Sequence, residues 1–154
     1  MKKVLLALAL SMGLIGTASA VNFGVNGGVV TGGNDGGLAG VTVGEKFGKI
    51  SVDAGYARGW QDLTTSNRWT LVAGYDVARV SGVTVTPKIG YAYLDNSNTA
   101  IKNSAPSASA GLVGVGVSYP VAKQISATAD YAYQFSGSSN NNANVITAGL
   151  KYSF

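Results

Sequence analysis

The residues able to do acid–base or metal chemistry are few in this sequence. There is no histidine and no cysteine, which removes the usual general base, the usual nucleophile–base pairs and the usual zinc ligands. Two neighbouring carboxylates could still act as acid and base, but the seven acidic residues are single and spread over different segments. The sequence therefore predicts a protein without enzymatic activity and without a metal or other cofactor.

Two glycine-rich stretches could suggest ligand loops. Gly32–Gly37 lacks the repeated acidic ligands of a calcium loop and the following helix of a phosphate loop. We expect it to be a flexible hairpin loop. Gly111–Gly116 lacks the dinucleotide-binding fingerprint and lies inside a predicted strand, where glycines relieve crowding.

The first 20 residues have the pattern of a cleavable secretory signal. Lys2 and Lys3 precede the apolar run Val4–Ile15, and Ala18–Ala20 matches the small-residue cleavage pattern. This run is too short to cross a bilayer as a helix, which needs about 20 residues. We therefore expect residues 1–20 to be removed and residues 21–154 to form one domain.

The charge balance of the remaining chain argues against nucleic-acid binding. Of the 11 basic residues, Lys2 and Lys3 belong to the signal, which leaves nine against seven acidic residues. These nine are scattered singly, whereas a nucleic-acid binder needs clustered basic groups to neutralise phosphates.

After residue 20 the dominant period of the sequence is two, which predicts strands joined by hairpins. The eight expected strands are Val21–Val30, Leu38–Gly44, Lys49–Gly59, Arg68–Val77, Val83–Leu94, Ser107–Tyr119, Ile125–Phe135 and Val145–Phe154. The longer, polar connections are Thr31–Gly37, Trp60–Asn67, Asp95–Pro106 and Ser136–Asn144, and the tight ones are Glu45–Gly48, Ala78–Gly82 and Pro120–Gln124. Alternation of short turns with longer loops is typical of transmembrane barrels.

The two faces of each expected strand differ in side-chain size. In the third strand Ile50, Val52 and Tyr56 share one parity, whereas Ser51 and Asp53 share the other. A soluble sandwich also alternates, but its solvent face is rich in Lys, Glu and Arg. Here the second face is mostly Gly, Ala, Ser and Thr, and charged residues make up only 12% of the chain. We therefore expect the bulky face to contact lipid and the small face to fill a narrow interior.

These patterns predict an all-β fold, an eight-stranded antiparallel up-and-down transmembrane β-barrel. Hydrocarbon offers no partner to a strand's N–H and C=O groups, so the sheet must close. Closure predicts that the first strand, Val21–Val30, pairs with the last, Val145–Phe154. Aromatic residues near the strand ends are expected to form interfacial girdles, namely Trp60, Trp69, Tyr75, Tyr93, Tyr119, Tyr133, Phe135 and Tyr152.

Charged residues on the inward face are expected to pair with one another. They are Asp53, Asp76 and Asp130 against Arg68, Lys88 and Lys151, which sum to zero. Pairing of Lys88 with Asp76 and of Lys151 with Asp130 is the expected arrangement, because buried charges require partners. The alternative is a thin ion path, which a glycine-rich lumen would allow; its glycines are Gly24, Gly28, Gly55, Gly74, Gly90, Gly114 and Gly116.

The last segment carries the most specific motif, since Ile146, Ala148, Leu150, Tyr152 and Phe154 alternate up to the C-terminal residue. In this and in its strand pattern the chain resembles the small eight-stranded outer-membrane barrels of the OmpA/OmpX type. The resemblance implies a monomer in the outer membrane of a Gram-negative bacterium, delivered by periplasmic chaperones. It also implies that Leu150, Tyr152 and Phe154 form the signal read by the barrel-assembly machinery.

Two classes of function follow from this resemblance. The first is a non-enzymatic envelope protein that supports membrane integrity or presents short loops to a surface partner, such as a host molecule or a phage. The second is a narrow, porin-like pore. Arg58 is the one charge on the lipid-facing parity, and we expect it, with Lys102, to contact lipopolysaccharide phosphates. The alternative is a bulge that turns Arg58 toward water.

Overall fold

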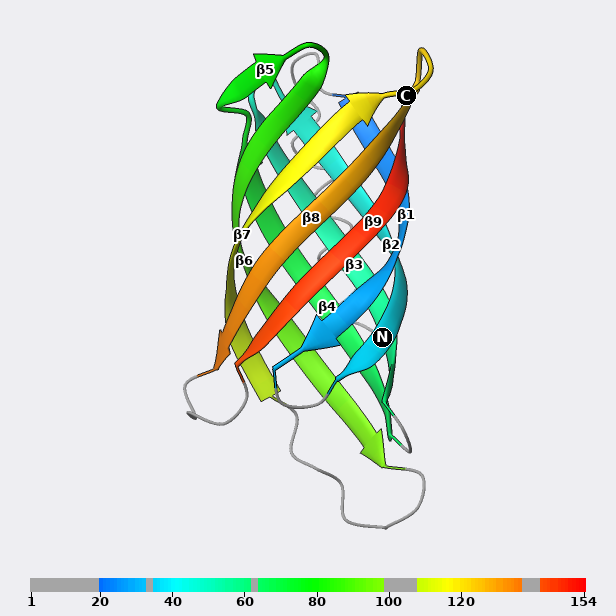
Figure 1. Ribbon diagram of the computed structural model, residues 1–154, viewed down its shortest axis with the longest axis vertical. Helices are drawn as coiled ribbons and strands as arrows, with labels where there is room; N and C mark the ends of the chain where they lie inside the picture. The colour runs from blue at the N-terminus through cyan, green and yellow to red at the C-terminus, as the bar shows by residue number, and fades with distance from the viewer. Residues whose placement is uncertain (1–19, 33–34, 62–63, 99–107, 137–141) are drawn as a thin grey trace.

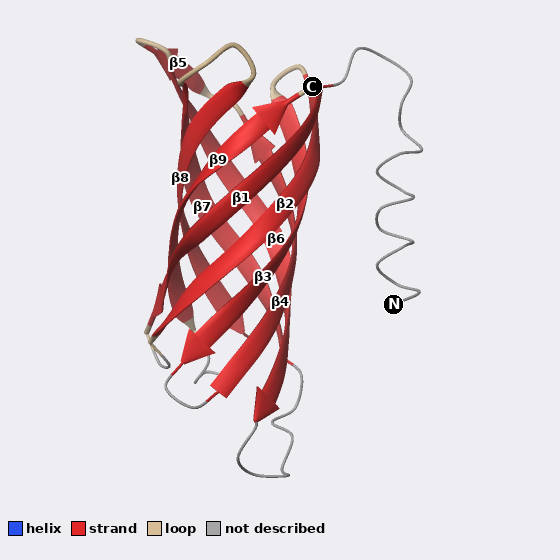
Figure 2. Ribbon diagram, turned by 90° about the vertical axis from the view of Figure 1, so that its right-hand side faces the viewer, coloured by secondary structure: helices blue, strands red, loops and turns tan. Residues whose placement is uncertain are grey.

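A computed structural model describes residues 20–32, 35–61, 64–98, 108–136 and 142–154, which form one barrel of tilted strands (Figures 1 and 2). The expected signal, residues 1–20, lies outside the described residues except for Ala20, so its cleavage stays a prediction. The strands are β1 (Ala20–Thr31), β2 (Gly36–Phe47), β3 (Ile50–Gln61), β4 (Thr64–Tyr75), β5 (Ala78–Val80), β6 (Val83–Asn98), β7 (Ala108–Pro120), β8 (Ile125–Ser136) and β9 (Ala143–Ser153). Within these residues no helix is long and apolar enough to cross a bilayer.

Every pairing in the sheet is antiparallel and the sheet is closed. β4 pairs with β6 past the three-residue β5, so that eight long strands surround the interior. β1 pairs with β9 from Asn22↔Ser153 to Thr31↔Asn144. The predicted eight-stranded barrel and the predicted contact between the first and last strands are therefore confirmed.

The two ends of the barrel differ in their connections. We call the end with the β1–β2, β3–β4, β6–β7 and β8–β9 connections the loop end, and the other end the turn end (Figure 1). At the turn end β5 and β6 form a hairpin through Ser81 and Gly82, whose φ angles of 50° and 86° suit a two-residue turn of type I′. The C-terminus also lies at the turn end (Figure 1).

One predicted connection is wrong. Trp60–Asn67 was expected to be a longer loop, but β3 and β4 stay paired up to Gln61↔Thr64. The polar residues that suggested a loop continue the hairpin instead. A strand that extends beyond an apolar environment meets water on its outer side and needs no apolar residue there.

Burial is inverted relative to a soluble protein. Large apolar side chains along the strands point outward and stay exposed, among them Val25 at 48%, Leu71 at 55% and Ile89 at 65%. Among the described residues, the buried apolar residues are two alanines, two leucines and one valine, all from the loop-end half: Leu38, Ala92, Ala110, Leu112 and Val145. The rest of the interior is mainly glycine and residues with hydroxyl, amide or charged side chains, together with a few apolar residues such as Val72. The polar chemistry of the described residues is therefore concentrated inside the barrel.

Candidate functional site in the barrel lumen

Three ion pairs cross the interior in its turn-end half. Lys88 Nζ of β6 contacts Asp130 Oδ1 of β8 at 2.5 Å, across β7. Lys151 Nζ of β9 contacts Asp53 Oδ1 of β3 at 2.9 Å, across β1 and β2. In both pairs each side chain is no more than 28% exposed. The interior therefore holds tied charges where an open channel would hold water.

The third pair lies at the rim of the turn end. Lys46 Nζ of β2 contacts Asp76 Oδ2, just after β4, at 2.5 Å, and Thr86 Oγ1 donates to Asp76 Oδ1 at 2.7 Å. Partial burial raises the pKa of the Asp76 carboxyl. The hydrogen bonds from Lys46 and Thr86 and the charges of Lys46 and Lys151 outweigh that effect, so the pKa lies below its ordinary value. Asp76 is therefore held as a carboxylate.

The predicted partners of these charges are wrong. Lys88 contacts Asp130, and Asp76 is held by Lys46 instead. Lys151 contacts Asp53 where Asp130 was expected. Lysine side chains reach over one or two neighbouring strands, so the partner depends on the stagger of the sheet as well as on parity.

Lys46 was missed by the sequence analysis because the second strand was ended at Gly44. In the structure β2 continues to Phe47, which places Lys46 on the inward parity of Leu38 and Thr42. The hairpin turn at Gly48, with φ of 61°, marks where the strand should have been ended. With Lys46 included, the inward charges of the described residues no longer sum to zero.

At several lumen glycines, the space that a Cβ would take is filled by a neighbouring side chain. A Cβ on Gly116 would meet Asp130 Oδ1 and would lie 2.9 Å from Lys88 Nζ. A Cβ on Gly24 would lie 2.5 Å from Thr42 Oγ1, and one on Gly74 2.7 Å from Thr86 Cγ2. Such distances are closer than packed carbon atoms allow. These three glycines therefore make room for an ion pair and for hydroxyl-bearing side chains, which fill part of the space that a pore would need.

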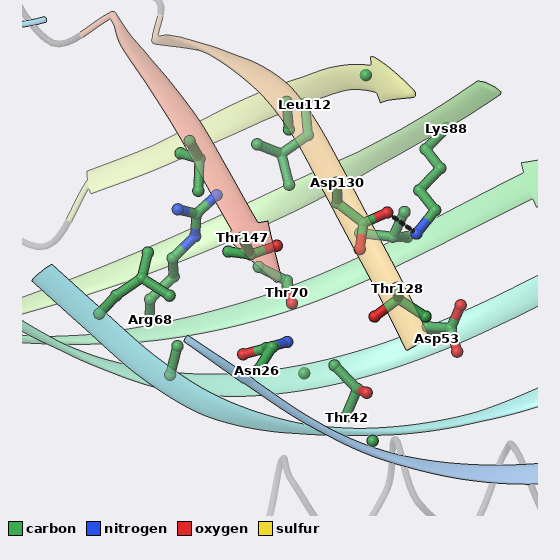
Figure 3. Close-up of a pocket in the computed structure, with 18 of the residues that line it drawn as sticks. Asn26, Thr42, Asp53, Arg68, Thr70, Lys88, Leu112, Thr128, Asp130 and Thr147 are labelled. Atoms are coloured by element: carbon green, nitrogen blue, oxygen red, sulfur yellow. Dashed lines mark hydrogen bonds and ion pairs between the residues drawn. The ribbon is translucent and has the colours of Figure 1, made fainter. Parts of the chain in front are cut away.

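A cavity of about 160 Å³ remains between the walls. It is lined by the pairs Lys88–Asp130 and Lys151–Asp53, by Arg68, and by the hydroxyl-bearing residues Thr42, Thr70, Thr128 and Thr147. Figure 3 shows the Lys88–Asp130 pair and, from another wall, Arg68 extending into this space. The volume has room for several water molecules. Among the described residues, no group of three or more potential metal ligands is gathered in one place.

Comparison with known proteins identifies the family. The family model described as Gram-negative porin matches residues 6–154. The chain belongs to the Gram-negative porin family. It is accordingly a protein of the bacterial outer membrane. No curated protein matches the chain.

Solved structures similar to this porin-family chain are small outer-membrane barrels. The N-terminal β-barrel domain of Pseudomonas aeruginosa OprF has a TM-score of 0.73 and 17% identity, over 88% of this chain and 97% of that one. Neisserial surface protein A has a TM-score of 0.68 and 16% identity, over 90% and 98%. Ail of Yersinia pestis, solved with the heparin analogue sucrose octasulfate, has a TM-score of 0.59 and 14% identity, over 88% and 97%. At these identities the similarity shows the fold.

The outer surface carries the aromatic residues expected in the girdles of this porin-family barrel. Seven of the eight are exposed: Trp60, Trp69, Tyr75, Tyr93, Tyr119, Tyr133 and Phe135. The eighth, Tyr152, packs edge-on against Phe154 with ring centroids 4.8 Å apart. Two outward tyrosines outside the expected set make hydrogen bonds to outward asparagines: Tyr56 Oη donates to Asn67 Oδ1 and Tyr131 Oη to Asn144 Oδ1, each at 2.8 Å.

Arg58 keeps its outward parity on β3. The register runs without interruption through Ala39↔Arg58 on one side and Arg58↔Asn67 on the other, so the bulge considered as an alternative is not formed. Arg58 is exposed near the loop end. Its expected companion, Lys102, lies outside the described residues.

The C-terminal segment presents its aliphatic and aromatic residues to the outside at the turn end. Leu150 is 52% and Phe154 74% exposed. The backbone of the last two residues is held, because Ser153 N–H donates to Gln124 O at 2.8 Å and Phe154 N–H to Val21 O at 3.0 Å. The residues expected to form the assembly signal therefore lie in an ordered, outward-facing segment of the porin-family barrel.

Proposed function

We propose that this chain is a non-enzymatic structural protein of the outer membrane, whose plugged barrel supports membrane integrity and carries short loops at the cell surface. The supporting observation is the set of three ion pairs, two of which pack against the inward glycines Gly116 and Gly44. Eight strands give an interior about wide enough for side chains alone. A lumen closed by tied charges leaves the lipid face and the loops as the working surfaces, with the loop end outside as in other barrels.

Planar-bilayer conductance tests this proposal. The wild-type barrel is expected to give no regular unitary steps. The double variant Lys88→Ala/Asp130→Ala removes the pair that crosses β7 and should introduce steps or raise the leak current. Arg79→Ala, at an exposed position of the short strand β5 at the turn end, serves as the matched control. Regular steps from the wild-type barrel would refute the plugged lumen and establish the alternative.

That alternative, a narrow pore, is favoured by membership of the porin family and by the cavity beside Arg68. A pore would have to lead past the pairs Lys88–Asp130 and Lys151–Asp53, both of which line the cavity. Conduction would then depend on transient separation of these charges, and the current should rise when either pair is removed. The structural role remains the primary proposal because all three pairs are formed together.

At the surface we propose a lipid contact at Arg58, where an exposed guanidinium can reach lipopolysaccharide phosphates. Replacement of Arg58 by Ala should lower the lipopolysaccharide that co-purifies with the barrel. Arg79→Ala, at the turn end, should leave it unchanged. Equal co-purification with wild type and Arg58→Ala would remove the contact.

The remaining proposed partners concern assembly and the cell exterior. We propose that periplasmic chaperones deliver the chain and that the barrel-assembly machinery reads Leu150, Tyr152 and Phe154. A host molecule or a phage is the kind of partner that short surface loops could engage. The closed sheet leaves the long strands without a free edge to pair with another copy, which supports a monomer.

A further inference from the structure

Arg68 is an inward cation that takes part in none of the three ion pairs. Among the described residues, the inward charges that are not fully exposed are Lys46, Arg68, Lys88 and Lys151 against Asp53, Asp76 and Asp130. Arg79 of β5 lies opposite Thr84 and shares their parity, but it is exposed beyond the barrel wall at the turn end. Each of the three lysines contacts one carboxylate. The inward side chains therefore have a net charge of +1, and this charge belongs to Arg68.

The surroundings of Arg68 provide little solvent. Its side chain projects from β4 in the loop-end half and the residue is only 8% exposed. Its Nε atom is fully buried and has no hydrogen-bond partner. Leu38, Leu112 and Val145, three of the five buried apolar residues, line the same cavity. The paired Lys88 and Lys151 side chains are about a quarter exposed and each contacts a carboxylate. The guanidinium of Arg68 lacks both the solvent and the carboxylate.

Loss of a proton cannot remove the charge of Arg68. A guanidinium group stays charged at any ordinary pH, and an isolated charge in apolar surroundings is costly unless an opposite charge or several hydrogen bonds offset it. The described chain supplies no carboxylate at Arg68. Since no carboxylate of the described residues compensates Arg68, an anion from solution can do so, and the cavity into which Arg68 extends (Figure 3) has room for a small ion together with water.

We propose that Arg68 binds one small monovalent inorganic anion, such as chloride, inside the barrel on the loop-end side of the cavity. A net charge of +1 selects a monovalent ion. The hydroxyl-bearing side chains of Thr70 and Thr147 line the same cavity and can donate to an anion. Asn26, whose Oδ1 is buried and unpartnered, also lines the cavity. A flip of its side-chain amide would direct the Nδ2 donor toward the anion in place of Oδ1. The lumen is thus a closed, charge-neutral unit only when the anion is bound.

The first test measures chloride binding directly in the folded barrel in detergent micelles. Sodium chloride is the probe, and exchange with a protein site broadens the chloride NMR line. The wild-type barrel should broaden the line more than Arg68→Met does. The control Arg79→Met, which removes an exposed arginine, should broaden it as the wild type does. Equal broadening by wild type and Arg68→Met would overturn the proposal.

The second test needs no variant and covers the case in which Arg68→Met fails to fold. Crystals of the wild-type barrel grown or soaked in bromide should show an anomalous peak within hydrogen-bonding distance of the Arg68 guanidinium. The absence of a peak there, with bromide found only at surface cations, would overturn the proposal. Neither test depends on conductance, so the proposal stands or falls separately from the plugged or conducting state of the barrel.

Discussion

The Lys88–Asp130 pair offers the sharpest test of what holds the lumen together. Lys88→Met keeps the aliphatic stem that packs over Gly116, where Lys88 Cε lies 2.8 Å from the position of a glycine Cβ. It therefore removes mainly the charge and leaves Asp130 without its cation. The two side chains are 24% and 28% exposed, which places the pair between a surface pair and a fully buried one.

The expected magnitude follows from that intermediate burial. Surface pairs contribute about 0.2–1 kcal/mol, and breaking a buried pair costs about 3–5 kcal/mol. We expect Lys88→Met to lower the free energy of unfolding by about 2 kcal/mol. Asp130→Asn should cost about the same, and the double variant should recover about 1–2 kcal/mol of the summed loss.

Urea unfolding of the barrel in lipid vesicles gives these free energies. Trp60 and Trp69, the two tryptophans of the chain, are both outward and exposed, so their fluorescence reports insertion into lipid. Lys123→Met, in the exposed β7–β8 turn, is the control and should change stability by less than about 0.5 kcal/mol. A coupling energy below about 0.3 kcal/mol would refute the argument, since independent sites add to within that error.

Three further outcomes are expected. Gly116→Ala should lower the free energy of unfolding by about 1–3 kcal/mol, because the added Cβ would push Lys88 and Asp130 apart. The control Gly27→Ala, whose outward Cβ would meet its nearest atom at 3.6 Å, should leave the free energy almost unchanged in the same urea titration. Equal losses in the two variants would contradict a packed lumen. The pKa of Asp76 lies below its ordinary value, so the stability lost in Asp76→Asn should be full above about pH 4 and should shrink as acid protonates the wild-type carboxylate; urea midpoints that differ equally at pH 7 and pH 3 would contradict this. Removal of Phe154 should lower the fraction of protein in cells that shifts its gel mobility on boiling, whereas Tyr119→Ala, an outward aromatic at the same end, should change it less; an unchanged fraction without Phe154 would contradict a terminal assembly signal.

The strands and the closure of the barrel were predictable because the two faces of each strand meet different environments, lipid outside and a polar interior. This difference gives the sequence its two-residue period. The bulky parity of β3, with Ile50 and Val52, faces outward at 50% and 37% exposure. The small parity, with Ser51 and Asp53, lies inside. Such a pattern needs no information on how the strands are staggered. It failed at Trp60–Asn67, where the sequence is mostly polar and the parity signal is weak.

The partners of the charges were not predictable from the same pattern. Parity places Lys88 inside but does not give the stagger of β6 against β8, which decides whether Asp76 or Asp130 lies within reach. A lysine side chain is long enough to cross a neighbouring strand, so small errors of register change the partner. Lys46 was not predicted as an inward charge, because the expected strand ended at Gly44 and the polar residues after it were assigned to the turn.

Strand number limits what this member of a porin family can do with its interior. An eight-stranded barrel has room for about one layer of side chains, whereas an aqueous channel requires a wider one. A charge placed inside then needs a partner within that layer, because only a few water molecules can reach it. The three lysine pairs meet this condition at the turn end and mid-height of the barrel. Arg68 does not meet it with the side chains described, which is why its charge points to a ligand from solution.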